Sequence, residues 1–232
     1  MEKFKKNILH AIKTRDGSYT LYISDLNETY HSRFGAVQES QHVFIKSGLE
    51  FIKNKNLNIL EIGFGTGLNV LLSVIYQQNN NYPKKIFFDS IEKYPLTFKL
   101  VQDLNYTSDI KQSKWFETIH NCHWNDYCEI LKDKFYLRKI NMDLLDFNPD
   151  KKYDLIYFDA FAPDKQPEMW TQDVFTKLYE NMNKNGVLVT YSAKGSVRRT
   201  MQSVGFEVER IPGPPGKREM LRAIKNHLTK IC

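Results

Sequence analysis

The sequence has few cysteines, and their spacing argues against a metal site. Among 232 residues only Cys122, Cys128 and Cys232 are cysteines. His120 and His123 lie close to the first two, which suggests metal ligation. However, the spacing matches no CxxC pattern and no second pair of ligands lies elsewhere in the chain. We therefore expect no bound metal and predict that this stretch is a surface loop.

Long apolar runs, repeats and extended linkers are also absent. The N-terminal segment MEKFKKNILHAIK lacks the apolar centre of a secretory signal, and no later run reaches the length of a membrane-spanning helix. We expect a cytoplasmic protein without membrane contact. The length suits one α/β domain with a small appendage. A net charge of +6 is compatible with a polyanionic partner but does not establish one.

Apolar strand-like segments alternate with helical segments through most of the chain. This alternation predicts a mostly parallel sheet with helices on both faces. The last two strands are joined by the short segment PGPPGKRE, so they must pair antiparallel. The predicted strands cover residues 58–64, 85–93, 135–143, 154–159, 186–192, 206–211 and 220–225. Seven strands ending in a hairpin are typical of the Rossmann-like class I methyltransferase fold.

The N-terminal residues follow a different pattern. Asp16 and Gly17 form a turn signal, and residues 19–24 are strand-like. We predict a small β appendage over residues 1–35 and a methyltransferase domain over residues 36–232.

The segment LEIGFGTGLN (60–69) is the strongest local signal. It lies between a predicted strand and a predicted helix, where ligands bind in doubly wound sheets. Gly63, Gly65 and Gly67 allow a tight turn and a close approach of the backbone to a ligand. Leu68 occupies the position at which a GxGxxG motif requires glycine, so the dinucleotide motif itself is not matched.

Three acidic residues stand at the ends of the first three main strands. Glu61 would repel a pyrophosphate but suits the ammonium and sulfonium groups of S-adenosylmethionine. Glu92 is placed to accept both ribose hydroxyls, and Asp143 to accept from the adenine amino group. Together the three acids favour an adenosyl cofactor.

Four segments of the sequence resemble one enzyme family. They are YHSRFGAVQESQHVFI, LEIGFGTGLN, DAFAPDKQPEMW and GPPGKREMLRA, and they resemble the methyltransferases that complete the 5-methylaminomethyl group of wobble uridine in bacterial tRNA. The resemblance spans about residues 30–225. It implies that the three glycines and three acids line the S-adenosylmethionine site and that Asp159 faces the reacting amine.

The resemblance also implies a difference in domain content. In many bacteria this domain is fused to a flavin-dependent oxidase, and the present chain looks like the stand-alone form. We therefore expect separate tRNA-modifying enzymes to supply the aminomethyl substrate.

Asp159 closes an apolar strand and is followed by a stiffened, aromatic-rich segment. A carboxylate there could accept a proton from the substrate amine, or hold an N–H so that the lone pair points at the methyl group. The sequence does not decide between these roles. Phe161 and Trp170 are candidates for stacking on an extruded base, with core packing as the alternative for each.

Basic residues near the predicted cleft suit the phosphates of a tRNA anticodon loop. Tyr30 belongs to a segment that could close over the cofactor or the substrate, together with Gln38 and Glu39, although helix packing is an equal interpretation. The candidates for phosphate contact are Lys165, Lys194, Arg198, Arg199, Lys217 and Arg218.

Two other functions remain open at this point. A small-amine methyltransferase or an aminopropyltransferase-like enzyme also needs an acid at this strand end, and Asp164 or Glu168 could provide the second acid that a polyamine requires. A non-catalytic RNA-binding module is disfavoured because the glycine turn and strand-end acids are intact.

Overall fold

The computed structural model describes residues 9–226. Predictions for residues 1–8 and 227–232, among them Cys232, lie outside the described part. No helix in the described range is long and apolar enough to cross a membrane.

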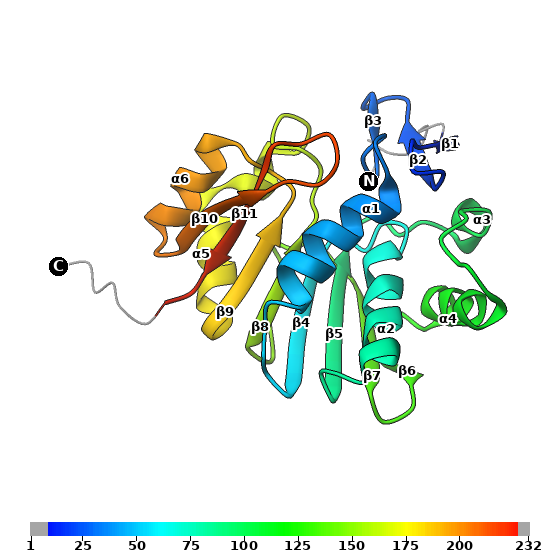
Figure 1. The fold of residues 1–232 in the computed structure, drawn as a ribbon. Helices are drawn as coiled ribbons and strands as arrows, with labels where there is room; N and C mark the ends of the chain where they lie inside the picture. Colours follow the sequence, from blue (N-terminus) through cyan, green and yellow to red (C-terminus); the bar gives the residue numbers. More distant parts are fainter. Residues whose placement is uncertain (1–8, 227–232) are drawn as a thin grey trace.

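An eight-stranded sheet forms the centre of the molecule (Figure 1), in the order β10-β11-β9-β8-β4-β5-β7-β6. The five strands from β9 to β7 are parallel, whereas β11, β10 and β6 pair antiparallel with their neighbours. The strands are β4 (Asn56–Ile62), β5 (Lys85–Glu92), β6 (Tyr127–Leu131), β7 (Phe135–Asn141), β8 (Tyr153–Phe158), β9 (Met182–Thr190), β10 (Glu207–Pro212) and β11 (Glu219–Ile224). The predicted Rossmann-like fold with a terminal hairpin is confirmed, and β6 is an additional edge strand.

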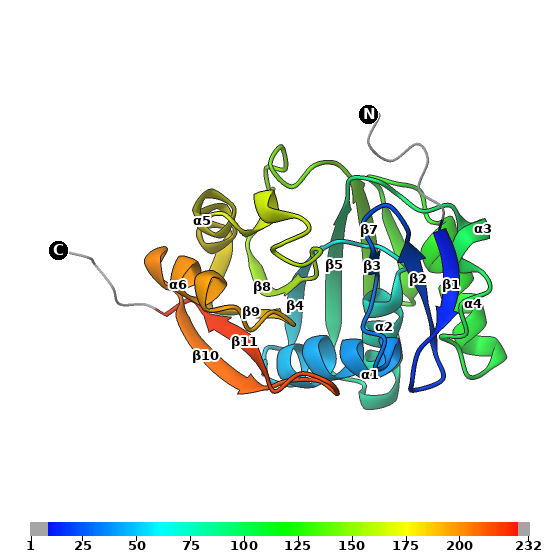
Figure 2. The same cartoon turned by 90° about the horizontal axis from the view of Figure 1, so that it is seen from above.

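Helices cover both faces of this sheet (Figure 2). One face carries α1 (Ala36–Ser40), which continues into the π-helical η1 (Gln41–Leu49), together with α2 (Leu68–Asn80) and α4 (Ile110–Asn121). The other carries α5 (Gln172–Glu180) and α6 (Gly195–Ser203). Two short helices, α3 (Phe98–Val101) and η2 (Pro167–Trp170), lie in connecting segments. Because both faces are covered, the central strands are mostly apolar, and Leu155, Ile156, Tyr157 and Phe158 of β8 are fully buried.

The N-terminal residues form a small antiparallel sheet, as predicted. It consists of β1 (Leu9–Lys13), β2 (Tyr19–Ile23) and β3 (Glu28–Thr29). Leu21 and Ile23 are buried, and the Lys165 Nζ donates to the Leu26 carbonyl oxygen at 2.9 Å. The appendage is thereby attached to the segment that follows β8. A domain boundary between residues 35 and 36 stays a prediction.

The cysteine-containing stretch is not the surface loop that the sequence suggested. His120 lies in α4, Cys122 ends that helix, and Cys128 lies in β6. Cys122 is 8% exposed, and its sulfur is joined to that of Cys128 in a disulfide. Within residues 9–226 no cluster of three or more potential metal ligands occurs.

The strand order reverses between β4 and β8. The chain leaves β4 for β5 and β7 on one side and then returns to β8 on the other. The carboxyl ends of β4 and β8 are joined by a hydrogen bond of 3.0 Å from the Asp159 N–H to the Ile62 carbonyl oxygen. Gly63 follows with a φ of +94°, and a Cβ placed on it would lie 2.8 Å from the Asp159 carbonyl oxygen. Only glycine allows the two strand ends to approach this closely.

We expect Gly63→Ala to lower the free energy of unfolding by about 2–4 kcal/mol, since it combines a left-handed backbone with a backbone clash. Gly17→Ala is the matched control, because Gly17 has a φ of +88° but nothing lies within 4 Å of the added carbon. The control should lose only about 1–2 kcal/mol. Chemical denaturation measures both, and equal losses would show that the approach at Gly63 is not the constraint.

Candidate active site

A cavity of about 1350 Å³ lies over the carboxyl ends of the parallel strands. Its walls come from the segments after β4, β5, β7 and β8, from the N-terminal appendage, and from the loop between β10 and β11. The cavity therefore lies where the strand order reverses, as ligand sites do in open α/β sheets.

Glu92 is held firmly at the end of β5. One carboxylate oxygen accepts from the Gly65 N–H at 3.1 Å and the other from the Tyr94 N–H at 2.8 Å. Burial raises the pKa of Glu92, although these backbone donors act in the opposite direction. Because each carboxylate oxygen can accept further hydrogen bonds, Glu92 can still bind a diol.

Asp143 lines the same part of the cavity and forms an ion pair with Lys93 at 2.6 Å. Its other oxygen accepts from the Leu145 N–H at 3.0 Å. Burial acts to raise the pKa of Asp143, but the Lys93 ammonium and the Leu145 N–H outweigh it, so the pKa lies below its usual value. Asp143 is therefore a charged acceptor at neutral pH.

Tyr30 covers the glycine turn. A Cβ on Gly65 would lie 3.2 Å from the Tyr30 Cδ1, so the ring rests on the backbone of the turn. Burial, with the Glu92 carboxylate second, raises the pKa of the Tyr30 hydroxyl far above its usual value. Gly67 begins α2 in a left-handed conformation close to His120.

Glu61 does not line the cavity, contrary to the sequence-based expectation. The side chain is fully buried in β4 and accepts a hydrogen bond from the Ser90 hydroxyl. Burial raises the pKa of Glu61 well above its usual value, and the nearby Asp159 and Glu92 carboxylates add to the rise. Glu61 lies beneath the cavity and not in its lining, so its part in cofactor binding stays a prediction.

Asp159 lies at the centre of the cavity, half-buried at the end of β8. One carboxylate oxygen accepts from the Asn69 side-chain amide at 2.9 Å. Burial raises the pKa of Asp159 to about 7, the Glu39 carboxylate adds to this, and Asn69 and Lys217 oppose it. A carboxyl group that titrates near neutral pH in a cavity is suited to proton transfer.

The two candidate stacking residues have different positions. Phe161 lines the cavity and packs edge-on against Tyr30, with ring centroids 5.4 Å apart. Trp170 is 7% exposed, contacts the rings of Phe158 and Phe175, and donates through Nε1 to the Phe161 carbonyl oxygen at 2.8 Å. Trp170 is therefore a core residue that holds Phe161 in place and cannot stack on a base.

The predicted basic residues do not form one outward-facing track. Lys217 points into the cavity wall and pairs with Glu39 at 2.9 Å, while Lys194 pairs with Asp164 outside the cavity lining. Lys165 lines the cavity and holds the Leu26 carbonyl, as described above. Arg198 and Arg199 lie on α6 and Arg218 is exposed; none of these three lines the cavity.

Three cavity residues were not assigned a chemical role from the sequence. Asn69 is the second residue of α2, within the quoted glycine segment, and only the fold shows that its amide reaches Asp159. Glu39 was noted as a closing or packing residue. Tyr191 belongs to the predicted fifth strand, and its hydroxyl donates to the Ala160 carbonyl oxygen at 2.8 Å.

Comparisons with known proteins agree with this geometry. The sequence pattern of a family described as S-adenosyl-L-methionine-dependent methyltransferase matches residues 102–226, slightly more than half of the chain. The chain belongs to this family. The methyltransferase is 31% identical to the tRNA 5-methylaminomethyl-2-thiouridine biosynthesis bifunctional protein MnmC of Pseudoalteromonas atlantica, over 92% of its own length and 34% of that protein.

Solved structures give the same fold. The crystal structure of MNMC2 from Aquifex aeolicus has a TM-score of 0.80 and 25% identity, covering 96% of the methyltransferase and 72% of that chain. Spermidine synthase from Thermotoga maritima has a TM-score of 0.53 and 12% identity, covering 95% and 73% respectively, and shows the fold alone. The methyltransferase spans about a third of the length of the curated MnmC proteins it matches.

The cavity fits S-adenosylmethionine, the cofactor of this family. Glu92 is fixed by backbone N–H groups with acceptor capacity left for a ribose diol, and the glycine turn lets the backbone approach a ligand closely. Asp143 lines the cavity as a charged acceptor suited to an exocyclic amino group. These residues would hold the cofactor.

We expect Asp159→Asn to raise the melting temperature more at pH 8 than at pH 5.5. The pKa of this acid is raised on folding. Its favourable contribution to the free energy of unfolding is therefore complete below the pKa of the unfolded chain, and it is lost as the pH rises through about 7. The neutral amide removes the cost of the buried charge.

Asp143→Asn is the control with the opposite sign, because the pKa of Asp143 is lowered on folding. Its ionised form stabilises the fold above the unfolded pKa, so this variant should lose stability at pH 8. Differential scanning calorimetry at both pH values measures the two changes. A lower melting temperature for Asp159→Asn at pH 8 would contradict the assignment.

Proposed function

We propose that this methyltransferase transfers a methyl group to the 5-aminomethyl group of a wobble uridine in tRNA, converting 5-aminomethyl-2-thiouridine to 5-methylaminomethyl-2-thiouridine. The observation that carries the proposal is Asp159, a carboxyl group with a pKa of about 7 in the cavity that fits the methyl donor. The similarity to MnmC and MNMC2 proteins over nearly the whole chain supports the choice of substrate.

S-adenosylmethionine supplies the methyl group when bound. The Asp159 carboxylate accepts a hydrogen bond from the substrate amine, leaves the nitrogen lone pair free for attack, and takes up the proton that the nitrogen releases. The Asn69 amide fixes the orientation of the carboxylate by holding one of its oxygens. Turnover should therefore increase as the pH rises through about 7.

The half of the cavity beside Asp159 suits an extruded base. Phe161 and Tyr30 provide an aromatic wall, and stacking of a base on such a ring contributes about 1–3 kcal/mol. A wobble nucleotide lies in a single-stranded loop, so its extrusion costs little. The proposal includes a cytoplasmic location and separate enzymes that produce the aminomethyl group.

Nucleoside mass analysis tests the reaction directly. tRNA that carries 5-aminomethyl-2-thiouridine is incubated with the protein and S-adenosylmethionine, and the modified nucleoside should gain the mass of one methyl group. Asp159→Asn should lower turnover by about 10²–10⁴-fold while the affinity for S-adenosylmethionine changes by no more than several-fold. Methylation of free amines but not of this tRNA would favour the small-amine enzyme instead.

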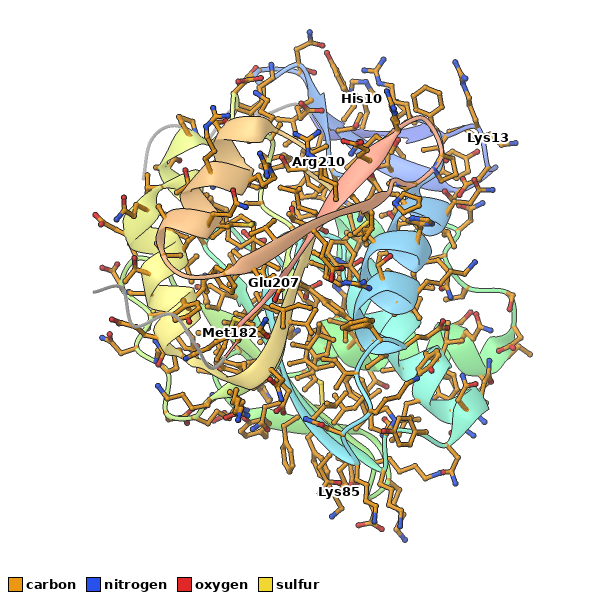
Figure 3. All side chains as sticks on the ribbon, turned by 60° about the vertical axis from the view of Figure 1, so that its left-hand side comes forward. His10, Lys13, Lys85, Met182, Glu207 and Arg210 are labelled. Atoms are coloured by element: carbon orange, nitrogen blue, oxygen red, sulfur yellow. A yellow bond between two sulfur atoms is a disulfide. The ribbon has the colours of Figure 1, made fainter. Side chains whose placement is uncertain are left out.

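Arg218 is exposed and directly follows Lys217 of the cavity wall, and we assign it a phosphate contact. Arg218→Ala should weaken tRNA binding and reduce the slope of log affinity against log salt by about 1. Lys85→Ala is the control, since Lys85 projects at the end of the molecule far from His10 and Lys13 of the appendage (Figure 3). Filter binding at several salt concentrations measures both slopes, and an unchanged slope for Arg218→Ala would remove this residue from the interface.

A further inference from the structure

A partly buried ion pair lies in the cavity wall and joins segments far apart in the sequence. Glu39 of α1 is 7% exposed, and one carboxylate oxygen accepts from the Lys217 Nζ at 2.9 Å. Its other oxygen accepts from the Ser32 N–H at 2.7 Å. Lys217 belongs to the loop between β10 and β11, so the pair ties the terminal hairpin to α1 and to the segment after the appendage.

The same ammonium group lies close to the segment that carries Asp159. The Lys217 Nζ lies 4.0 Å from the centroid of the Tyr191 ring, a cation–π contact. The Tyr191 hydroxyl in turn donates to the carbonyl of Ala160, the residue next to Asp159. Glu39, Lys217, Tyr191 and Asp159 all line the one cavity.

The loop between β10 and β11 also packs closely against Phe34 beside Lys217. Gly216 has a φ of +86°, and a Cβ there would lie 2.4 Å from the Phe34 ring. The Lys217 N–H donates to the Pro214 carbonyl oxygen at 2.9 Å, which closes the turn. The turn therefore fixes the backbone at Lys217, and Glu39 and the Tyr191 ring hold its ammonium group.

We propose that Glu39 and Lys217 are positioning residues that set the charge of Asp159 through their opposite charges. The Lys217 ammonium favours the carboxylate form of Asp159, and the Glu39 carboxylate favours the neutral form and also neutralises Lys217. The catalytic consequence rests on the proposed function, whereas the coupling of charges does not.

Charged groups of both signs act on Asp159. The Glu39 carboxylate raises its pKa and the Lys217 ammonium lowers it. The groups that face or act on Asp159 are Glu39 from α1, Glu61 from β4, Asn69 from α2, Tyr191 directly after β9 and Lys217 from the hairpin loop.

Removal of the Lys217 charge and removal of the Glu39 charge should shift the titration midpoint of Asp159 in opposite directions. Nuclear magnetic resonance of ¹³C-labelled aspartate follows the titration of the Asp159 carboxyl, with Asp159→Asn assigning the signal. The midpoint should rise by about one pH unit in Lys217→Met and fall by a similar amount in Glu39→Gln. The double variant should titrate between the two, and Lys217→Arg, which keeps the charge, should stay near the wild-type midpoint.

The acidic limb of the pH profile of methyl transfer should move with these midpoints. Unchanged midpoints in Lys217→Met and Glu39→Gln would overturn the proposal, because a pair that only braces the loop lowers turnover without moving a titration. If Lys217→Met fails to fold, as judged by circular dichroism, Glu39→Gln and Lys217→Arg still decide the question. Absence of methyl transfer in the wild-type protein, with the midpoint shifts present, would contradict the proposed function alone.

Discussion

The site depends on the hydrogen bond between the ends of β4 and β8. The N–H of Asp159 reaches the carbonyl of Ile62, and Gly63 lies so close to Asp159 that no side chain fits between them. This contact places the glycine turn, which we propose receives the cofactor, beside the carboxyl group that we propose faces the substrate. Both segments begin on strands that are buried on two faces, so the distance between them is set by the core and not by flexible loops.

A site of this kind concentrates carboxyl groups at the expense of stability. Glu61, Glu92 and Asp159 all have pKa values raised by burial, because each charge would be poorly solvated. The three carboxyl groups have different hydrogen-bond donors. Ser90 donates to Glu61, backbone N–H groups donate to Glu92, and Asp159 has one amide donor and a distant ammonium group. Of the two carboxyl groups with a single side-chain donor, Asp159 lines the cavity and Glu61 does not, so Asp159 is the one that a ligand can reach.

The fold could be predicted from the sequence because its strands are apolar and its turns are marked by glycine and proline. Strand β6 was missed, since Tyr127–Leu131 has only two buried side chains and lies at a sheet edge, where its pattern looks like that of a loop. The same error hid the pairing of Cys122 with Cys128, because sequence gives no distance between α4 and an unrecognised strand.

The sequence predicted which residues stand at the strand ends better than it predicted which way their side chains face. Glu92, Asp143 and Asp159 line the cavity, as expected from strand ends, because all parallel strands present their carboxyl ends at one edge. Glu61 lies one residue earlier than Ile62, at a strand position that faces the core, and this difference removes it from the cavity. Trp170 was ambiguous, and only the packing against Phe158 decides that it supports Phe161 from behind.

Lys217 shows why charge alone does not identify a nucleic-acid contact. Its neighbours Pro214 and Gly216 bend the hairpin loop, and this bend turns the ammonium group inward to Glu39 and Tyr191. The adjacent Arg218 remains exposed. Two consecutive basic residues thus have different surroundings: one forms an ion pair in the cavity wall, and the other is exposed to solvent.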